Sequence, residues 1–360
     1  MKFGGMVATK IDDWRIFSYL EELGYDSGWV PDSQMIWSDC YATLSLAAHT
    51  TSRIRLGTGV AIAGTRLAPV TAHSIASINK LAPGRVFLGI GTGHTAMRIM
   101  GQNPVSPNQF EEYLRVVRGL LMGEEVEYSY GNAYRPIQFL DRDLACIDIE
   151  NRIPLYIAAN GPKALRAAGA FGEGRISAGN EPISLFKKNL ERITQGAAAV
   201  GRTMSDTFHS AVMTFSCVLK SGEKLTSERV IEETGAQVVA SLHFWYELYH
   251  QRGNDNFVID SVRDIWEDYK SYVETEMPLD RRHLLLHEGH CATLPNKERR
   301  FVTPSMIRAS GGLVGEVDEI VSRIDSLEKA GLKEIVLMPP RDVMRENFGI
   351  FSKEVIGRWR

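Results

Sequence analysis

Three glycines at alternate positions follow a short apolar run and leave one strand end without side chains. The run is Val86-Phe87-Leu88-Gly89-Ile90, and the glycines are Gly89, Gly91 and Gly93. An apolar run without alternation is typical of a strand buried on both faces. Glycine in a strand either allows tight packing within a barrel or lets a ligand approach the backbone. A flat aromatic ring laid across this strand end would need that absence of side chains.

The same glycines do not form the dinucleotide-binding fingerprint. That pattern, G-x-G-x-x-G, opens a helix and has an acidic residue about 20 positions further on. Here Gly93 comes one residue early, and no strand ending in Asp or Glu follows at that distance. Nicotinamide binding on a Rossmann domain is therefore not favoured.

A second candidate site is Asn160-Gly161-Pro162-Lys163, between an apolar run and an alanine-rich helix. Pro162 suits the first position of a helix, where its missing N–H costs nothing. Backbone N–H groups at a helix start attract phosphate, and Lys163 adds charge. The alternative is an ordinary helix start with a good turn. The neighbouring strand end without side chains favours the phosphate site.

Two charged residues stand at the ends of other expected strands. Arg66 follows the small residues of Thr58–Thr65, and Asp32 follows Trp29-Val30-Pro31. Arg66 is a candidate for binding a substrate carboxylate or phosphate, although such an arginine more often pairs with an acidic neighbour. Asp32 is a candidate catalytic residue, although an Asp that caps the next helix would look the same.

The segment His283–Cys291 is rich in histidine, with His283, His287 and His290. The zinc protease motif H-E-x-x-H is absent, because this chain has H-E-x-H and Gly289 argues against a continuous helix. We therefore expect no metal here and assign His290 to a histidine-lined wall that contacts substrate. Trp245, in the aromatic helix 238–250, is a second candidate substrate residue, with core packing as the alternative.

Strand and helix patterns alternate along most of the chain and must position these residues. Eight strands interleaved with helices predict a closed (β/α)₈ TIM barrel, whose site lies at the carboxyl ends of the strands. The expected strands are residues 2–7, 27–31, 54–62, 86–90, 153–159, 174–179, 211–219 and 334–339.

Two stretches exceed the minimal barrel. Residues 127–148 are polar and aromatic and predict a small hairpin or loop. Residues 220–301 form a long insertion after strand seven, expected to cap the mouth of the barrel or to build an interface. The chain 1–360 is accordingly predicted to be a single barrel domain with a capping insertion at about 220–301.

Composition excludes several classes of function. The net charge is −3, with Lys and Arg spread among Asp and Glu, which argues against nucleic acid as a partner. No apolar run approaches the roughly 18 residues that span a bilayer, and the start of the chain lacks the pattern of a signal peptide. Four cysteines without paired spacing, Cys40, Cys146, Cys217 and Cys291, predict reduced thiols of a cytoplasmic enzyme.

With these residues in view, the chain resembles the bacterial luciferase-like family of flavin-dependent oxidoreductases, and most closely its branch that includes methylenetetrahydromethanopterin reductase. The resemblance rests on five motifs outside the long insertion. They are Trp29-Val30-Pro31-Asp32, Ile54-Arg55-Leu56-Gly57-Thr58-Gly59-Val60, Pro83–Gly91, Asn160-Gly161-Pro162-Lys163 and Val314–Ile320. The family fold, a barrel with a large insertion after strand seven, agrees with the pattern described above.

The resemblance implies a reduced flavin at the mouth of the barrel, either FMN or its deazaflavin analogue F420. Thr58, Gly59 and Val60 would then back the ring, with a cis peptide at Gly59–Val60 in a bulge. Gly91, Thr92 and Gly93 would lie beside the cofactor, and Asn160, Gly161, Pro162 and Lys163 would hold its phosphate. Many relatives have His after the Asp of strand two, where this chain has Ser33. Only Asp32 is carried over as catalytic. His94 becomes the candidate proton donor or stabiliser of an oxygen intermediate, with a histidine at the rim that faces solvent as the alternative.

The main hypothesis is a two-component monooxygenase that uses reduced FMN and O₂ on a small organic substrate. A separate flavin reductase would supply the flavin, and the family's habit suggests a homodimer. F420-dependent hydride transfer is the alternative, because both reactions use the same cradle. A non-catalytic flavin-binding protein is the alternative of another class. A sugar-phosphate isomerase is less favoured, because no Lys or Glu base stands at a strand end.

Overall fold

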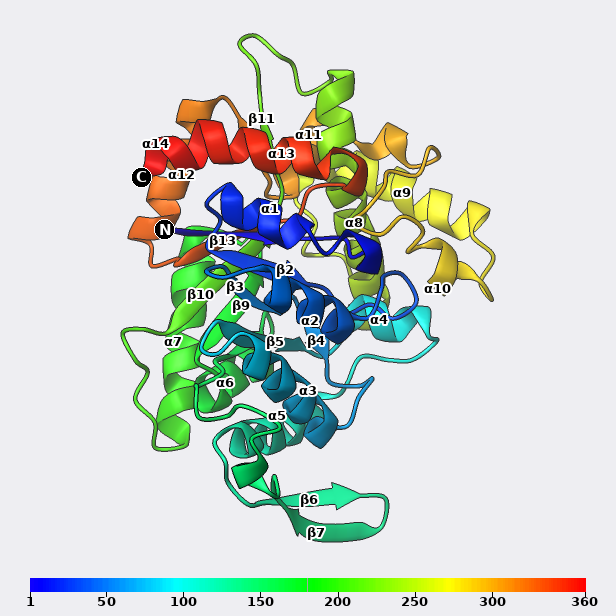
Figure 1. The fold of residues 1–360 in the computed structure, drawn as a ribbon. Coiled ribbons are helices and arrows are strands. Elements are labelled where there is room, and N and C mark those ends of the chain that lie inside the picture. Colours follow the sequence, from blue (N-terminus) through cyan, green and yellow to red (C-terminus); the bar gives the residue numbers. More distant parts are fainter. Residues whose placement is uncertain (180) are drawn as a thin grey trace. The chain divides into compact units, whose positions relative to one another are not determined.

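Parallel strands alternating with helices close into a barrel, as the sequence predicts (Figure 1). The computed structural model describes residues 1–179 and 181–360. The sheet has the strand order β3-β2-β1-β13-β10-β9-β8-β5-β4, and a further pairing of β3 with β5 closes it. Its strands are β1 Lys2–Met6, β2 Ser27–Val30, β3 Arg55–Thr58, β4 Ala61–Ile62, β5 Val86–Gly91, β8 Leu155–Ala158, β9 Gly174–Ala178, β10 His209–Thr214 and β13 Glu334–Leu337.

The third barrel strand is interrupted at its carboxyl end. β3 and β4 both pair with β5, with Gly57 opposite Phe87 and Ala61 opposite Ile90. Between these two pairs the chain advances four residues from β3 to β4 but only three along β5. This excess of one residue is a β-bulge. The Gly59–Val60 peptide within this bulge is cis, as the resemblance implied.

The structure divides into two compact units, which we describe separately. The first comprises Met1–Ser177, Pro182–Val212 and Ala330–Ile335, and the second comprises Ala178–Glu181, Met213–Lys329 and Val336–Arg360. Helices of the first unit are α1 Ile16–Glu22, α2 Cys40–Thr50, α3 Ala68–Leu81, α4 His94–Ile99, α5 Pro107–Leu121, α6 Pro162–Phe171 and α7 Ile183–Ala199. Whether the chain acts as a single domain with a cap stays a prediction.

Large rings fill the interior of the first unit. Trp29 packs on Phe87 with ring centroids 4.3 Å apart, Phe87 on Tyr156 at 5.3 Å, and Tyr156 on His209 at 4.7 Å. These residues come from β2, β5, β8 and β10, so the rings cross the barrel. Gly174 makes room for them, because a Cβ there would lie 2.6 Å from Tyr156. This alternation of large and absent side chains fills a barrel without voids.

One buried carboxylate anchors the amino end of the barrel. Glu334, which is 1% exposed, contacts His209 Nε2 at 2.6 Å and Trp29 Nε1 at 3.2 Å, and it accepts a hydrogen bond from Ser27. Burial acts to raise the pKa of Glu334, but these donors and the charge of His209 outweigh it, and the pKa is lowered. The buried charge is stabilised only while this set of partners is complete.

The second unit has its own apolar core. The helix α8 Glu228–Arg252 packs Trp245 and Tyr246 into a buried cluster with Trp266 and Tyr269 of α9 Arg263–Glu276. β11 Ser216–Val218 pairs with β12 Leu313–Gly315, so the predicted strand 211–219 is split into β10 and β11. The remaining helices of this unit are α10 Arg282–Leu285, α11 Pro304–Ala309, α12 Val317–Lys329, α13 Met344–Phe351 and α14 Gly357–Trp359.

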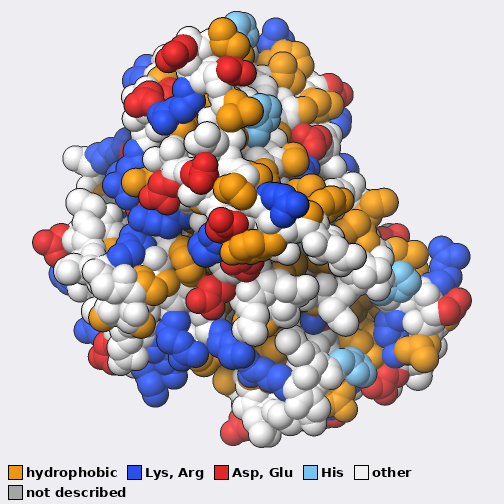
Figure 2. Space-filling model, turned by 90° about the horizontal axis from the view of Figure 1, so that it is seen from below, with side chains coloured by type: hydrophobic (Ala, Val, Ile, Leu, Met, Phe, Trp, Pro, Cys, Tyr) orange, Lys and Arg blue, Asp and Glu red, His pale blue; other side chains and the backbone are white. Residues whose placement is uncertain are grey.

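Several peripheral expectations can be compared with the structure. Residues 127–148 include the predicted hairpin, formed by β6 Val126–Tyr130 and β7 Ala133–Ile137. All four cysteines are unpaired, with Cys40 and Cys217 buried and Cys146 exposed. No helix in the described part of the chain is long and apolar enough to cross a bilayer. Basic, acidic and apolar side chains are all spread over the face shown in Figure 2.

Replacement of Glu334 by Gln is expected to destabilise the protein by about 3–5 kcal/mol at neutral pH, because the buried groups of Ser27, Trp29 and His209 lose the carboxylate that they contact. The pKa of Glu334 is lowered in the folded chain, so the unfolded chain binds more protons as the pH falls. The contribution of this carboxylate is complete above about pH 5 and is lost as the pH falls from the ordinary glutamate value near 4.3 through the lower pKa of the folded chain. Urea unfolding midpoints at several pH values measure both effects.

Glu346, an exposed glutamate of α13, provides the matched control. Glu346→Gln is expected to change stability by less than about 0.5 kcal/mol. If Glu334→Gln kept the acid sensitivity of the parent protein, the carboxylate would not be the group responsible.

Candidate functional site

Four strand ends meet at the carboxyl end of the barrel in the first unit. Their strands are parallel to their neighbours, so the residues that follow β2, β3, β5 and β8 lie at the same end. A Cβ placed on Gly91 would lie 3.0 Å from Val60 Cγ2 and 3.2 Å from Ala158 Cβ. The bulge, the glycine strand and the fifth barrel strand are therefore in direct contact.

The three glycines of this region serve different purposes. A Cβ on Gly89 would clash with the carbonyl of Thr58, so this glycine allows tight packing within the barrel. Gly93 has φ of +79° and precedes α4, a backbone conformation that favours glycine. Gly91 lies at the last position of β5, beside the partly exposed Val60 and Thr92. Gly91 is itself buried, and a Cβ there would crowd Val60 and Ala158, so it also fits the packing alternative. Its role beside a ligand stays a prediction.

Most of the residues predicted to back the ring are buried and hydrogen-bonded within the barrel. Thr58 is fully buried, and its hydroxyl donates to the carbonyl of Gly89 at 2.6 Å. The N–H of Gly59 donates to the carbonyl of Val30 at 2.7 Å. Val60 alone among these residues is partly exposed. The side chain of Val60 and the adjacent backbone are therefore the parts of this segment that could contact a ring.

The predicted phosphate site is an open helix start. α6 begins at Pro162, no described side chain caps it, and Asn160, Gly161, Pro162 and Lys163 are all exposed. A Cβ on Gly161 would meet nothing within 4 Å. Unoccupied space at an uncapped helix start suits an anion, because the helix dipole and backbone N–H groups face it.

Arg175 is a residue that sequence reasoning treated only as part of a strand. It is 1% exposed, and its Nε donates to the carbonyl of Ala159 at 2.8 Å. Its Nη2 lies 3.5 Å from Asn160 Oδ1. A buried cation thus supports the residues just before α6 and adds positive charge near the candidate phosphate site. The only signal in the sequence was an arginine within an otherwise apolar barrel strand.

Asp32 and Arg66 form an ion pair. Arg66 Nη1 lies 2.6 Å from Asp32 Oδ2, which also accepts from the N–H of Ile62 at 3.2 Å. Arg66 Nη2 contacts Asp39 at 2.9 Å, so the pairing alternative for this arginine is present. Burial acts to lower the pKa of Arg66, but the charge of Asp32 outweighs it and the pKa is raised. The role of Arg66 as a substrate ligand stays a prediction.

His94, the candidate proton donor, is the first residue of α4, a short helix that the sequence analysis did not predict. Its side chain is partly buried, and it follows Gly93 directly at the end of the glycine strand. Its position at the carboxyl end of β5 agrees with the predicted position at the rim, and its role stays a prediction.

In the second unit, Trp245 is 6% exposed and packs edge-on against Trp266, with ring centroids 6.4 Å apart. This packing agrees with the core-packing alternative for this helix, and the role of Trp245 as a substrate residue stays a prediction.

His290 lies beside two buried histidines, His243 of α8 and His287, and its Nε2 is 3.5 Å from Cys291 Sγ. Burial and the two neighbouring histidines hold the pKa of His290 well below its usual value. Burial raises the pKa of the Cys291 thiol to about 12. His283 is not part of this group, since α10 ends at Leu285 before His287.

Comparison with curated proteins gives relatives of two kinds. The chain is 26% identical over 347 residues to 5,10-methylenetetrahydromethanopterin reductase of Methanolobus tindarius, covering 94% of this chain and 93% of the relative. It is 35% identical over 203 residues to the F420-dependent glucose-6-phosphate dehydrogenase of Mycolicibacterium fortuitum. That second match covers 52% of this chain and 59% of the relative.

Among solved structures, the coenzyme F420-dependent tetrahydromethanopterin reductase of Methanopyrus kandleri has the same fold. The TM-score is 0.74 at 21% identity, with 100% of this chain and 99% of that chain covered. The family model described as luciferase-like monooxygenase matches residues 14–334. The matched range includes every barrel strand except β1 and most of β13, so the chain belongs to the bacterial luciferase-like family of oxidoreductases.

Proposed function

We propose that the protein is an F420-dependent oxidoreductase that transfers a hydride between the deazaflavin and a small organic substrate. The proposal is carried by two similar proteins that are F420-dependent, a dehydrogenase 35% identical over 203 residues of this chain and a reductase of the same fold. This was the alternative to FMN in the sequence analysis, and the similar proteins favour it over the monooxygenase.

The residues at the carboxyl end of the barrel fit a cofactor with a flat ring and a phosphate. Val60 in the bulge and Thr92 after β5 are partly exposed and would give the ring a surface, with Gly91 packed between the strands beneath them. The uncapped start of α6, at Asn160–Lys163, would hold the phosphate, with Arg175 adding positive charge. Thr92 and Gly93 continue the ring side of this surface. When bound, F420 supplies or accepts the hydride.

The chain's own residues would position the reactants and handle the proton. In this proposal the carboxylate of Asp32 is held in a fixed position beside the bulge. Arg66 compensates its charge, and the N–H of Ile62 donates a hydrogen bond to it. His94 donates or accepts a proton at its imidazole as the substrate is reduced or oxidised, since hydride transfer to a carbonyl also requires one. His290, whose neighbours are described above, is kept as a candidate substrate residue.

The second candidate function is the two-component monooxygenase with reduced FMN and O₂, favoured by the description of the family model. A separate flavin reductase belongs to that candidate. A homodimer and a cytoplasmic location are proposed with either function.

Binding measurements with F420 and FMN separate the two candidates. We expect F420 to bind at least tenfold more tightly than FMN, a difference of about 1.4 kcal/mol. Fluorescence titration of the purified chain with each oxidised cofactor, and equilibrium dialysis with each reduced form, measure the two dissociation constants. Tighter binding of FMN, with O₂ uptake on addition of reduced FMN, would favour the monooxygenase instead.

Replacement of Gly161 by Asp tests the phosphate site without damage to the fold. Gly161 has φ of −86° and ψ of 157°, which any residue adopts, and space for a side chain is open. Asp is a favoured residue at this helix position and would cap α6 while placing a negative charge at the anion site. We expect unchanged or higher thermal stability together with at least tenfold weaker cofactor binding.

Gly161→Ala is the control, since it adds only a methyl group where nothing lies within 4 Å. It should bind the cofactor within about twofold of the parent protein. Equal affinity of the Asp and Ala variants would place the phosphate elsewhere.

Replacement of His94 by Gln is expected to slow the chemical step by at least about 100-fold while leaving the dissociation constant of F420 unchanged. Single-turnover oxidation of reduced F420, with a substrate found by screening small carbonyl compounds, measures the rate. His73→Gln is the matched control, because His73 is an exposed histidine of α3. A rate unchanged in the His94 variant would remove this residue from the reaction.

A further inference from the structure

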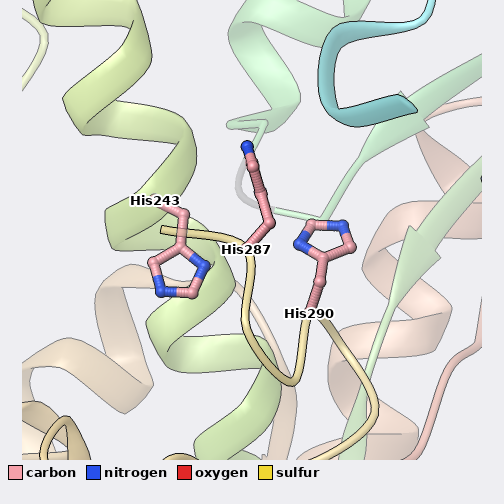
Figure 3. A group of neighbouring side chains, drawn as sticks. All are labelled: His243, His287 and His290. Atoms are coloured by element: carbon pink, nitrogen blue, oxygen red, sulfur yellow. The ribbon is translucent and has the colours of Figure 1, made fainter. Parts of the chain in front are cut away.

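Three histidines converge in the second unit, remote in sequence from one another. His243 comes from the middle of α8, and His287 and His290 come from the segment that follows α10 (Figure 3). One ring nitrogen of each lies within 4.8 Å of those of the other two. The ring centroid of His287 is 6.2 Å from that of His243 and 5.4 Å from that of His290.

Buried carboxylates orient the first two of these rings. His243 Nε2 lies 2.9 Å from Glu298 Oε2, and His287 Nε2 lies 2.8 Å from Glu247 Oε1. A carboxylate accepts a hydrogen bond, so each Nε2 carries the proton and each Nδ1 presents a lone pair. Tyr269 also donates to Glu298, at 3.3 Å, which fixes that carboxylate.

The two Nδ1 atoms are left without protein partners. His243 is 1% and His287 is 4% exposed, and neither Nδ1 has a hydrogen-bond partner among the described residues. A buried acceptor without a donor costs free energy, and two such acceptors in one cluster are unusual in a core. Packing alone explains the contact between the rings but not the two unpartnered acceptors.

We infer that His243, His287 and His290 bind a divalent transition-metal ion, with Zn²⁺ the cation that suits the ligands best. Imidazole nitrogen suits Zn²⁺, and a carboxylate on the second ring nitrogen is the usual support of a histidine that binds metal. Three protein ligands leave a fourth position for water or a small molecule. The site goes beyond the proposed function, since it uses none of the barrel residues assigned to the cofactor and gives His290 the role of a metal ligand in place of a substrate contact.

Binding would draw the three rings together. Zn–N bonds of about 2.0–2.1 Å in a tetrahedral site place ligand nitrogens about 3.3 Å apart. The present separation of up to 4.8 Å therefore closes by about 1.5 Å. His290 lies on a segment whose Gly289 and Cys291 have φ of +68° and +54°, so this segment is not part of a regular helix that would resist the movement.

Metal binding to the untagged full chain tests the inference without any cofactor present. After treatment with a chelator and its removal, we expect one equivalent of Zn²⁺ per chain, measured by elemental analysis and by competition with a chromogenic zinc indicator. Co²⁺ should give the visible absorption of a tetrahedral site. Added Zn²⁺ should raise the Tm of the parent protein.

His290→Gln, at the least buried of the three ligands, should weaken Zn²⁺ binding by at least about 100-fold and abolish the rise in Tm. Glu298→Gln, which leaves all three ligands in place, should weaken it by about 10–100-fold. His283→Gln is the matched control, because His283 lies in α10, just before this segment, and outside the cluster.

Bound Zn²⁺ far below one equivalent per chain, or equal affinity in the His283 and His290 variants, would overturn the assignment. Since F420 is absent from these measurements, their failure leaves the proposed oxidoreductase unaffected, and failure of F420 to bind leaves the metal site unaffected.

Discussion

The barrel depends on one buried charge, the carboxylate of Glu334. Glu334 is buried at the first position of β13, and its partners Ser27 and His209 are the first residues of β2 and β10. An ionised carboxylate in such a place is tolerated only with donors in fixed positions, so the register of three strands is specified by one side chain. This network lies at the amino ends of the strands, opposite the candidate site. Stability and chemistry are thereby assigned to different ends of the barrel.

Most barrel strands were predictable from sequence because both of their faces are buried. The run Val86–Ile90 and the closing run Glu334–Leu337 need no alternation to be recognised, and the structure confirms both. The third strand was predicted as one run, since a bulge changes hydrogen bonding without changing composition. The six-residue helix α4 is too short to show a helical period. The helix α7 carries Phe186, Ile193 and Ala197 on its buried face. This spacing indicates an amphipathic helix, which the sequence analysis did not predict.

The candidate site was predictable where it is made of backbone and not where side chains meet from distant segments. Glycine at strand ends and a Gly-Pro helix start are local patterns, so the sequence alone could name Gly91 and Asn160–Lys163 as candidates. Arg175 lies in β9 and reaches the residues after β8, a contact that depends on the neighbouring position of two strands. The histidine motif was rejected because its local spacing is wrong for a helix. His243, more than 40 residues earlier, completes the cluster only through the fold.

The histidine cluster also bears on how its segment keeps one conformation. Residues 286–298 contain no helix or strand, so their backbone is held by contacts with other segments. Gln237 donates to the carbonyl of Cys291 at 3.1 Å, and Arg341 N–H donates to the carbonyl of Ala292 at 2.9 Å. Each contact of this kind contributes only about 1 kcal/mol net. A metal ion joining α8 to this segment would contribute several times more, because its ligands bind it only when both are folded together. The cluster is therefore suited to fastening an irregular segment onto a helix.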